Sequence, residues 1–172
     1  MGCNRPGIGG LPGEYRGSAE SFAEFARLAS EVGAGLAEAG MSLNYHNHSF
    51  ELARFGDQTG LDILIENSCP DCVTFELDLY WVQHGGGSPV AWIKKLGRRA
   101  PVVHFKDMGI TPDMQQFYAE VGEGNLDWCG ILAACEETGV QFAIVEQDTC
   151  QRDSLEAVAI SYRNMKAMGM PD

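Results

Sequence analysis

The sequence predicts an α/β fold built around a parallel sheet, and three observations indicate it. Four helix ends are marked by glycine, the residue that most readily takes the left-handed conformation closing a helix: Gly40, Gly97, Gly139 and Gly169. The first three are each followed within a few residues by a short apolar run, at 41–45, 100–105 and 140–145. A further run, at 73–81, is rich in strand-forming residues. Strands that alternate with helices at this spacing imply right-handed crossovers and parallel pairing.

Helical patterns separate these runs. The longest covers 18–39, where Ser21 and Glu24 have the spacing of a capping box. Shorter helical candidates cover 59–67, 88–97, 125–138 and 153–168. The predicted order is a leading helix followed by four strand-helix units. Residues 1–172 form one domain in this interpretation, since no change in composition marks a linker.

Composition excludes several classes of protein. Hydrophobic residues make up 45% of the 172 residues and charged residues 21%, which are globular proportions. No apolar stretch approaches the roughly 18 residues of a membrane span, and the first residues do not resemble a signal peptide, so we expect no membrane partner and a cytoplasmic location. The formal charge of −12 opposes binding to nucleic acid, which needs a basic surface.

The six cysteines include one closely spaced pair, Cys69 and Cys72 in the segment Cys-Pro-Asp-Cys. This spacing occurs in zinc knuckles and redox motifs, but no second pair follows it. A turn that precedes a strand is the favoured interpretation.

Each predicted strand ends in residues that can bind a metal. The candidates, one for each unit, are Glu51, Asp78, His104 and Glu146. Their separations are 27, 26 and 42 residues, near the roughly 31 residues that a (β/α)8 barrel uses for each unit. Ligands bind at the carboxyl ends of parallel strands, so the four side chains should converge at one mouth. Each residue alone has an ordinary alternative, as a helix cap, a surface carboxylate or a packed histidine, but the joint pattern predicts a site for one divalent ion: Mn, Mg, Co or Zn.

Five segments resemble the sugar phosphate isomerase/epimerase family, with its xylose isomerase-like TIM barrel. Residues 45–51 are similar to the family's YHNHxFE strand and residues 77–82 to its LDxYWV segment. Residues 104–107 resemble HxKD, 122–128 GEGxxDW and 144–148 the VEQD segment. The resemblance covers the chain from about residue 18 and implies a partial barrel, its C-terminal half.

The resemblance implies a metal-dependent isomerase or epimerase that acts on a small sugar or keto-sugar through an enediolate. It implies Glu51, Asp78, His104 and Glu146 as ligands, with Glu51 and Glu146 also transferring protons. His46, His48, Lys106 and Asp107 are candidates for substrate contacts or for support of the ligands. Trp81 stands where the better-understood keto-sugar 3-epimerases have histidine, so isomerisation, epimerisation and elimination by a lyase or dehydratase all stay open.

Length suggests that further units are needed, because 172 residues supply about 5.5 units and not eight. We expect a fragment or half barrel that associates, as a homo-oligomer or with the missing N-terminal half. One alternative is a non-catalytic metal- or carbohydrate-binding remnant. A DNA-repair endonuclease of the related fold is disfavoured by the charge and by having only four histidines. The match of residues 46–48 to the name of the HNH nucleases is accidental.

Overall fold

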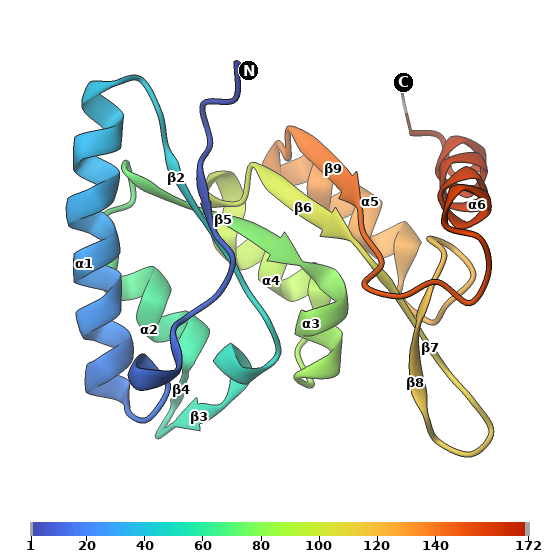
Figure 1. Ribbon diagram of the computed structural model, residues 1–172, viewed down its shortest axis with the longest axis horizontal. Helices are drawn as coiled ribbons and strands as arrows, with labels where there is room; N and C mark the ends of the chain where they lie inside the picture. The colour runs from blue at the N-terminus through green and yellow to red at the C-terminus, as the bar shows by residue number, and fades with distance from the viewer. Residues whose placement is uncertain (1, 171–172) are drawn as a thin grey trace.

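A parallel sheet of five strands forms the centre of the molecule (Figure 1). The computed structural model describes residues 2–170. The strand order is β1 (Gly7–Ile8), β2 (Leu43–His46), β5 (Val73–Asp78), β6 (Val102–Phe105) and β9 (Phe142–Val145), and all four neighbouring pairs are parallel. The four predicted strands are confirmed. The edge strand β1 was not predicted, because two residues beside glycine and proline carry no strand pattern.

The five predicted helices are also confirmed: α1 (Ala19–Glu38), α2 (Gly60–Asn67), α4 (Pro89–Leu96), α5 (Trp128–Thr138) and α6 (Ser154–Ala167). The expected capping box at Ser21 and Glu24 is wrong. The cap of α1 is Ser18, whose Oγ accepts a hydrogen bond from the backbone N–H of Ser21 at 3.2 Å. A capping box does begin α2, where Thr59 and Asp62 bind each other's backbone N–H groups.

The predicted strand at 73–81 ends earlier than expected. A short helix, α3 (Leu79–His84), follows β5 directly, so the strand prediction for its last three residues is wrong. The carboxylate of Asp78 accepts a hydrogen bond from the backbone N–H of Trp81 at 2.9 Å and so caps this helix. The same cap fixes the position of Asp78 at the mouth of the sheet.

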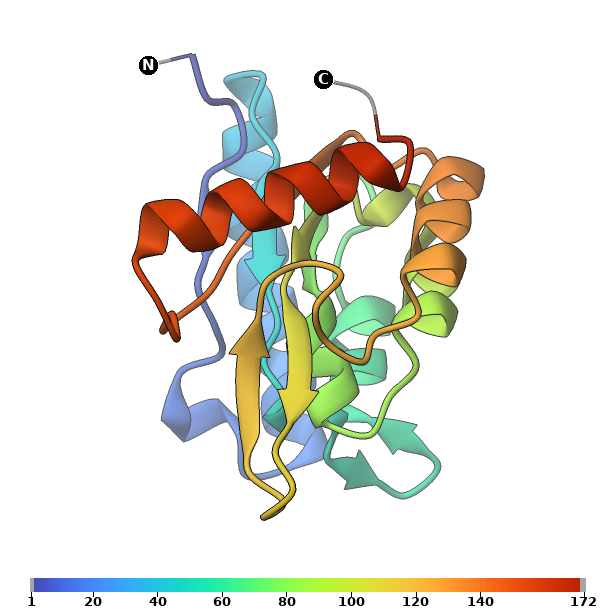
Figure 2. The ribbon, with the colours of Figure 1, turned by 90° about the vertical axis from the view of Figure 1, so that its right-hand side faces the viewer.

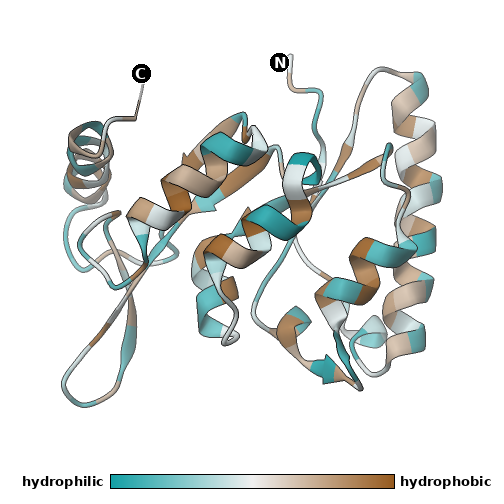
Figure 3. Cartoon of the chain, turned by 180° about the vertical axis from the view of Figure 1, so that it is seen from behind, coloured by the Kyte–Doolittle hydropathy of each residue, from teal (hydrophilic) through white to brown (hydrophobic). Residues whose placement is uncertain are grey.

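The two faces of the sheet differ in chemistry. One face packs its apolar side chains against the helices, which lie in front of the sheet in the view from behind (Figure 3). The fully buried residues of this layer include Tyr45, Phe75, Leu77, Val103 and Phe105. The opposite face carries polar residues near the strand ends. It also carries Phe142 and Ile144 of β9, which are 55% and 45% exposed. The part of this second face formed by β9 is therefore exposed in the described residues.

Shorter elements complete the fold. They are the 3-10 turns at Gly13–Tyr15, Phe50–Leu52 and Gly97–Arg99, and the hairpins β3 (Arg54–Phe55) with β4 (Gln58–Thr59) and β7 (Asp107–Ile110) with β8 (Gln116–Ala119). Figure 2 shows α6 with the β7–β8 hairpin below it. Ser161 of α6 accepts a hydrogen bond from the N–H of Val121, which follows β8. None of the helices in residues 2–170 has the length and apolar character needed to cross a membrane.

Candidate functional site

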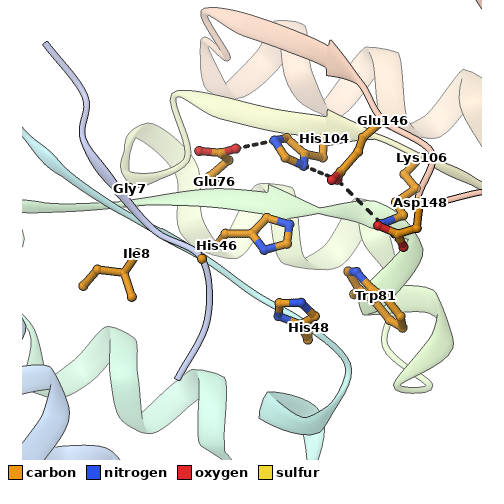
Figure 4. Close-up of a pocket in the computed structure, with 11 residues that line it drawn as sticks. Gly7, Ile8, His46, His48, Glu76, Trp81, His104, Lys106, Glu146 and Asp148 are labelled. Atoms are coloured by element: carbon orange, nitrogen blue, oxygen red, sulfur yellow. Dashed lines mark hydrogen bonds and ion pairs between the residues drawn. The ribbon is translucent and has the colours of Figure 1, made fainter. Parts of the chain in front are cut away.

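A pocket of about 360 Å³ lies at the carboxyl ends of the strands (Figure 4). Its walls come from the strands β1, β2, β5 and β6, from α3, and from the loops that follow β1, β2, β6 and β9. The lining residues are Gly7, Ile8, Gly9, His46, His48, Glu76, Trp81, His104, Lys106, Glu146 and Asp148. Seven polar or charged side chains therefore meet at one end of the sheet, as the parallel topology requires: His46, His48, Glu76, His104, Lys106, Glu146 and Asp148.

Asp78 is the centre of the polar cluster. Its Oδ2 lies 3.3 Å from Nε2 of His46, 3.8 Å from Nδ1 of His104 and 3.7 Å from Nζ of Lys106. The side chain is fully buried. Burial alone would raise the pKa of Asp78, but the hydrogen bonds with His104 and His46 and the charge of Lys106 hold it well below its usual value. Asp78 is therefore an anion around which the other groups are arranged.

His104 lies between two glutamates, as Figure 4 shows. Its Nδ1 is 2.6 Å from Oε2 of Glu146, and its Nε2 contacts Oε1 of Glu76. Burial lowers the pKa of this imidazole, but its hydrogen bonds to Asp78, Glu146 and Glu76 outweigh that effect and raise it to about 11. The raised pKa indicates that negative charge surrounds His104, and such surroundings favour the binding of a cation.

The donor set fits a divalent metal ion. His46, Asp78, His104 and Glu146 each offer one ligand atom, and these atoms all lie within 4.8 Å of one another. Two imidazoles and two carboxylates suit borderline ions such as Zn, Mn or Co. With Nδ1 of His104 facing the cluster, its Nε2 points at Glu76. A carboxylate behind a ligating histidine is the usual arrangement for fixing the ring.

Glu51, expected as a ligand and proton-transfer group, lies outside this cluster. Its carboxylate is fully buried and accepts hydrogen bonds from the Tyr45 hydroxyl at 2.6 Å and from the backbone N–H of His48 at 2.9 Å. It holds the turn after β2 in place, and His46 lies in the cluster where Glu51 was expected. The strand register explains why His46 lies here. His46 directly follows the apolar run and pairs with Glu76, and Glu76 lies on the same face of β5 as Asp78, two residues later.

Asn47 supports the cluster, although the sequence pattern gives it no role. Its side chain is buried, accepts a hydrogen bond from the N–H of Asp78 at 2.9 Å and donates one to the Asp78 carbonyl oxygen at 3.4 Å. These bonds join the ends of β2 and β5, the strands that carry His46 and Asp78. Asn47 therefore fixes the distance between the ends of β2 and β5, and with it the positions of His46 and Asp78 relative to each other.

Lys106 points into the pocket as a buried cation. Its side chain is 1% exposed, and its Nζ lies 2.8 Å from Asp148 and 3.6 Å from Glu146. Three aromatic rings surround it: the ammonium lies 5.0 Å from the centroid of Trp81, 4.9 Å from that of Tyr118 and 5.7 Å from that of Tyr80. Asp148 was not among the predicted site residues, although it lies two residues after Glu146 and lines the same pocket.

Asp107, expected at the substrate, is directed away from the pocket. Its buried carboxylate accepts five hydrogen bonds, from the N–H groups of Met108, Gly122, Gly124 and Leu126 and from the indole N–H of Trp128. All of its acceptor capacity is used inside the protein. Asp107 therefore organises the loop at residues 122–128. This explains why the sequence combines an acidic residue after Lys106 with a glycine-rich loop.

His48 and Trp81 form one wall of the pocket. Their ring centroids are 5.4 Å apart, and Nδ1 of His48 is buried with no hydrogen-bond partner in the structure. Burial and the neighbouring His46 lower the pKa of His48, so its imidazole is neutral at neutral pH. A neutral imidazole can both donate and accept hydrogen bonds, which suits contact with a hydroxyl group.

No family model matches the chain, and no curated protein matches it either. Solved structures do. A sugar phosphate isomerase/epimerase from Parabacteroides distasonis aligns with a TM-score of 0.80 and 24% identity, over 96% of this chain and 58% of that one. A xylose isomerase domain protein from Planctomyces limnophilus gives 0.71 and 17%, over 97% and 58%.

A probable 3-DHS dehydratase from Bacillus anthracis, AsbF, involved in petrobactin synthesis, gives a TM-score of 0.68 and 17% identity, over 98% of this chain and 64% of that one. The chain thus spans less than two thirds of the length of these structures. At these identities the likeness establishes the fold, and the partial barrel expected from the sequence is confirmed. The chain has the fold of the sugar phosphate isomerase/epimerase and xylose isomerase-like TIM barrels, present as five parallel strands with their helices.

Proposed function

We propose that this chain carries the metal- and sugar-binding centre of an isomerase or epimerase that acts on a small sugar or keto-sugar. The observation that carries the proposal is the convergence of His46, Asp78, His104 and Glu146 at the strand ends, with Glu76 behind His104. The structures of similar fold support the reaction class. This ligand set replaces Glu51 of the sequence expectation with His46.

A divalent ion held there would polarise a substrate carbonyl and stabilise the charge that develops on its oxygen. The protein's own residues do the remaining work. Glu146 is the proposed proton-transfer group, since its side chain is 35% exposed and lines the pocket. Lys106, 3.6 Å from Glu146, places a fixed positive charge beside the carboxylate. A carboxylate already held at the carbon next to the carbonyl needs little movement to remove a proton.

The substrate class follows from the pocket walls. Trp81 offers an aromatic face to the C–H groups of a sugar, and His48, Lys106 and Asp148 offer polar atoms for hydroxyl groups. A volume of about 360 Å³ suits a small molecule and not a polymer. Asp107 does not enter this set, because its carboxylate is used inside the fold.

Elimination of water is the second candidate reaction. The buried ammonium of Lys106 lies between Glu146 and Asp148, so an acid and a carboxylate base stand side by side in the pocket. Such a pair can remove a proton with Glu146 while Lys106 protonates a departing hydroxyl. The likeness in fold to a dehydratase fits this second candidate.

We also propose that the pocket is completed by association. The chain spans 58–64% of the similar structures reported above, and the apolar side chains of Phe142 and Ile144 are exposed on the face that bears the pocket. Covering that face, by a second copy or by a polypeptide that supplies further barrel strands, would bury both side chains and enclose the substrate.

Metal binding tests the central proposal. Native mass spectrometry of the purified chain, titrated with Mn, Co and Zn, should show one ion per chain that is lost on chelation. Asp78→Ala should abolish that binding, while Asp57→Ala, in the exposed turn between β3 and β4, should leave it unchanged. An unchanged stoichiometry in Asp78→Ala would refute the site. Metal binding with no turnover across a keto-sugar panel, alone or after association, would favour a binding remnant.

A further inference from the structure

A second chemical site lies at the opposite end of β5, in the turn between α2 and β5. We propose that Cys69 and Cys72 form a reversible dithiol–disulfide pair, a redox modification site separate from the pocket. The two Sγ atoms are 2.7 Å apart, within about 0.7 Å of the length of a disulfide bond. Both thiols are half-buried, and the two residues between them, Pro70 and Asp71, are exposed. A small oxidant can therefore reach the pair.

The backbone holds the turn firmly. The N–H of Cys69 donates to Oγ of Ser30 on α1 at 2.8 Å, and the Cys69 carbonyl oxygen accepts from the N–H of Val73 at 3.0 Å. Gly33 of α1 packs so closely that a Cβ there would lie 2.8 Å from the carbonyl oxygen of Cys72. Because both ends of the turn are fixed against α1 and β5, the thiols are already ordered for bond formation.

The two thiols are not equivalent. The hydrogen-bonding contact with the Cys72 thiol and the backbone N–H groups of Asp71 and Cys72 lower the pKa of Cys69. The same thiol–thiol contact raises the pKa of Cys72. The guanidinium of Arg99, which also binds the carbonyl oxygens of Ile65 and Val73, interacts electrostatically with Cys69. This asymmetry makes Cys69 the attacking thiolate and Cys72 the resolving thiol.

A metal is the competing occupant of a Cys-x-x-Cys turn. Structural zinc needs four ligands, commonly two further cysteines or histidines. Within residues 2–170 the clusters of three or more metal-competent side chains comprise only the group at the pocket, so the two thiols lack partners for such a site. The geometry therefore favours sulfur–sulfur bonding over metal binding.

The proposed reaction uses a low-molecular-weight disulfide such as glutathione disulfide as the oxidant. The Cys69 thiolate attacks one sulfur of the oxidant, forms a mixed disulfide and releases one glutathione thiolate. Cys72, on losing its proton, attacks Sγ of Cys69 and releases the second glutathione. The two protein thiols lose two electrons and two protons, and glutathione disulfide is reduced to two thiols.

The experiment exposes the full chain to glutathione buffers of graded redox ratio, alkylates the remaining thiols and analyses the peptides by mass spectrometry. We expect the peptide with both cysteines to lose two hydrogens, resist alkylation and recover with dithiothreitol. The exposed thiol of Cys129, which has no neighbouring cysteine within three residues, serves as an internal control that should form a mixed disulfide with glutathione. Metal binding at the pocket should be unaffected by oxidation, so failure of one proposal is distinguishable from failure of the other.

Single variants test the order of attack. Cys72→Ser should accumulate glutathione on Cys69, and Cys69→Ser should form its mixed disulfide at Cys72 more slowly, because Arg99 acts on Cys69. Two results would overturn the proposal in the unmodified chain, whether or not the variants fold. One is a peptide that stays fully alkylatable at every redox ratio; the other is bound zinc that protects both thiols.

Discussion

Replacing Asp107 by asparagine should destabilise the fold while leaving the pocket's own groups in place. Oδ2 of Asp107 accepts from the N–H groups of Gly122 and Gly124 at 2.9 and 3.1 Å and from the Trp128 indole at 2.6 Å. Oδ1 accepts from the N–H groups of Met108 and Leu126 at 2.8 and 3.2 Å. An amide keeps one oxygen, so two or three of these five donors would face an NH2 group.

The cost follows from that count. Leaving a buried donor unsatisfied costs about 1–3 kcal/mol, so two donors give about 2–6 kcal/mol. Relaxation of the loop at 122–128 lets some donors reach water, and we expect a loss of about 2–4 kcal/mol in the free energy of unfolding. That is a large share of the roughly 5–15 kcal/mol that stabilises a typical domain.

Urea unfolding followed by circular dichroism and tryptophan fluorescence measures the change. The matched control is Asp113→Asn, because Asp113 lies exposed in the turn between β7 and β8, and we expect a change within about 0.5 kcal/mol. An Asp107→Asn variant with an unchanged free energy of unfolding but no metal or sugar binding would refute this role. The carboxylate would then act at the pocket and not in the loop.

Three further predictions test separate parts of the structure. Glu76→Gln should weaken metal binding about 10- to 100-fold in a competition titration, because Glu76 orients His104; an affinity equal to that of the unmodified chain would contradict this role. Asp62→Asn should cost about 1 kcal/mol in urea unfolding, because it weakens the capping box in which Thr59 is the N-cap of α2 and removes the ion pair of Asp62 with Lys95. Burial raises the pKa of Asp62, but Lys95 and Thr59 lower it overall. This contribution to stability is therefore present at pH values above the pKa of Asp62 in the unfolded chain, and it is lost as the pH falls through the pKa in the folded protein. A stability difference between the two proteins that persists in acid would contradict this role of Asp62. Ile144→Asp should reduce self-association in analytical ultracentrifugation if the exposed face pairs, and an unchanged distribution would argue against pairing there.

The fold was predictable where its signals are local. Glycine at helix ends and the apolar runs after them predict four of the helices and three of the strands within a few residues, and a run of strand-forming residues predicts β5. The strand at 73–81 was extended too far because Leu79, Tyr80 and Trp81 are strand formers by type. The cap from Asp78 turns them into a helix, and a cap of this kind depends on where the carboxylate points and not on residue type.

The candidate site was predictable as a pattern but not residue by residue. Asp78, His104 and Glu146 come together because parallel pairing aligns the ends of β5, β6 and β9. The sequence pattern predicts Glu51 for this unit because a carboxylate follows the apolar run, and the structure places it five residues past the end of β2. Side-chain alternation instead selects His46, the last residue of the strand, and sends Glu51 into a turn held by Tyr45.

Charge balance in the pocket explains why these groups coexist. Asp78, Glu76, Glu146 and Asp148 are four carboxylates, and Lys106 is the one lysine or arginine among the residues that line the described pocket. Buried or half-buried anions of like sign repel one another unless cations offset them. The carboxylates around His104 raise the pKa of its imidazole, so a proton on this ring offsets part of their charge. A divalent ion bound by Asp78 and Glu146 would supply two positive charges among these carboxylates, so the repulsion between the carboxylates would itself favour metal binding.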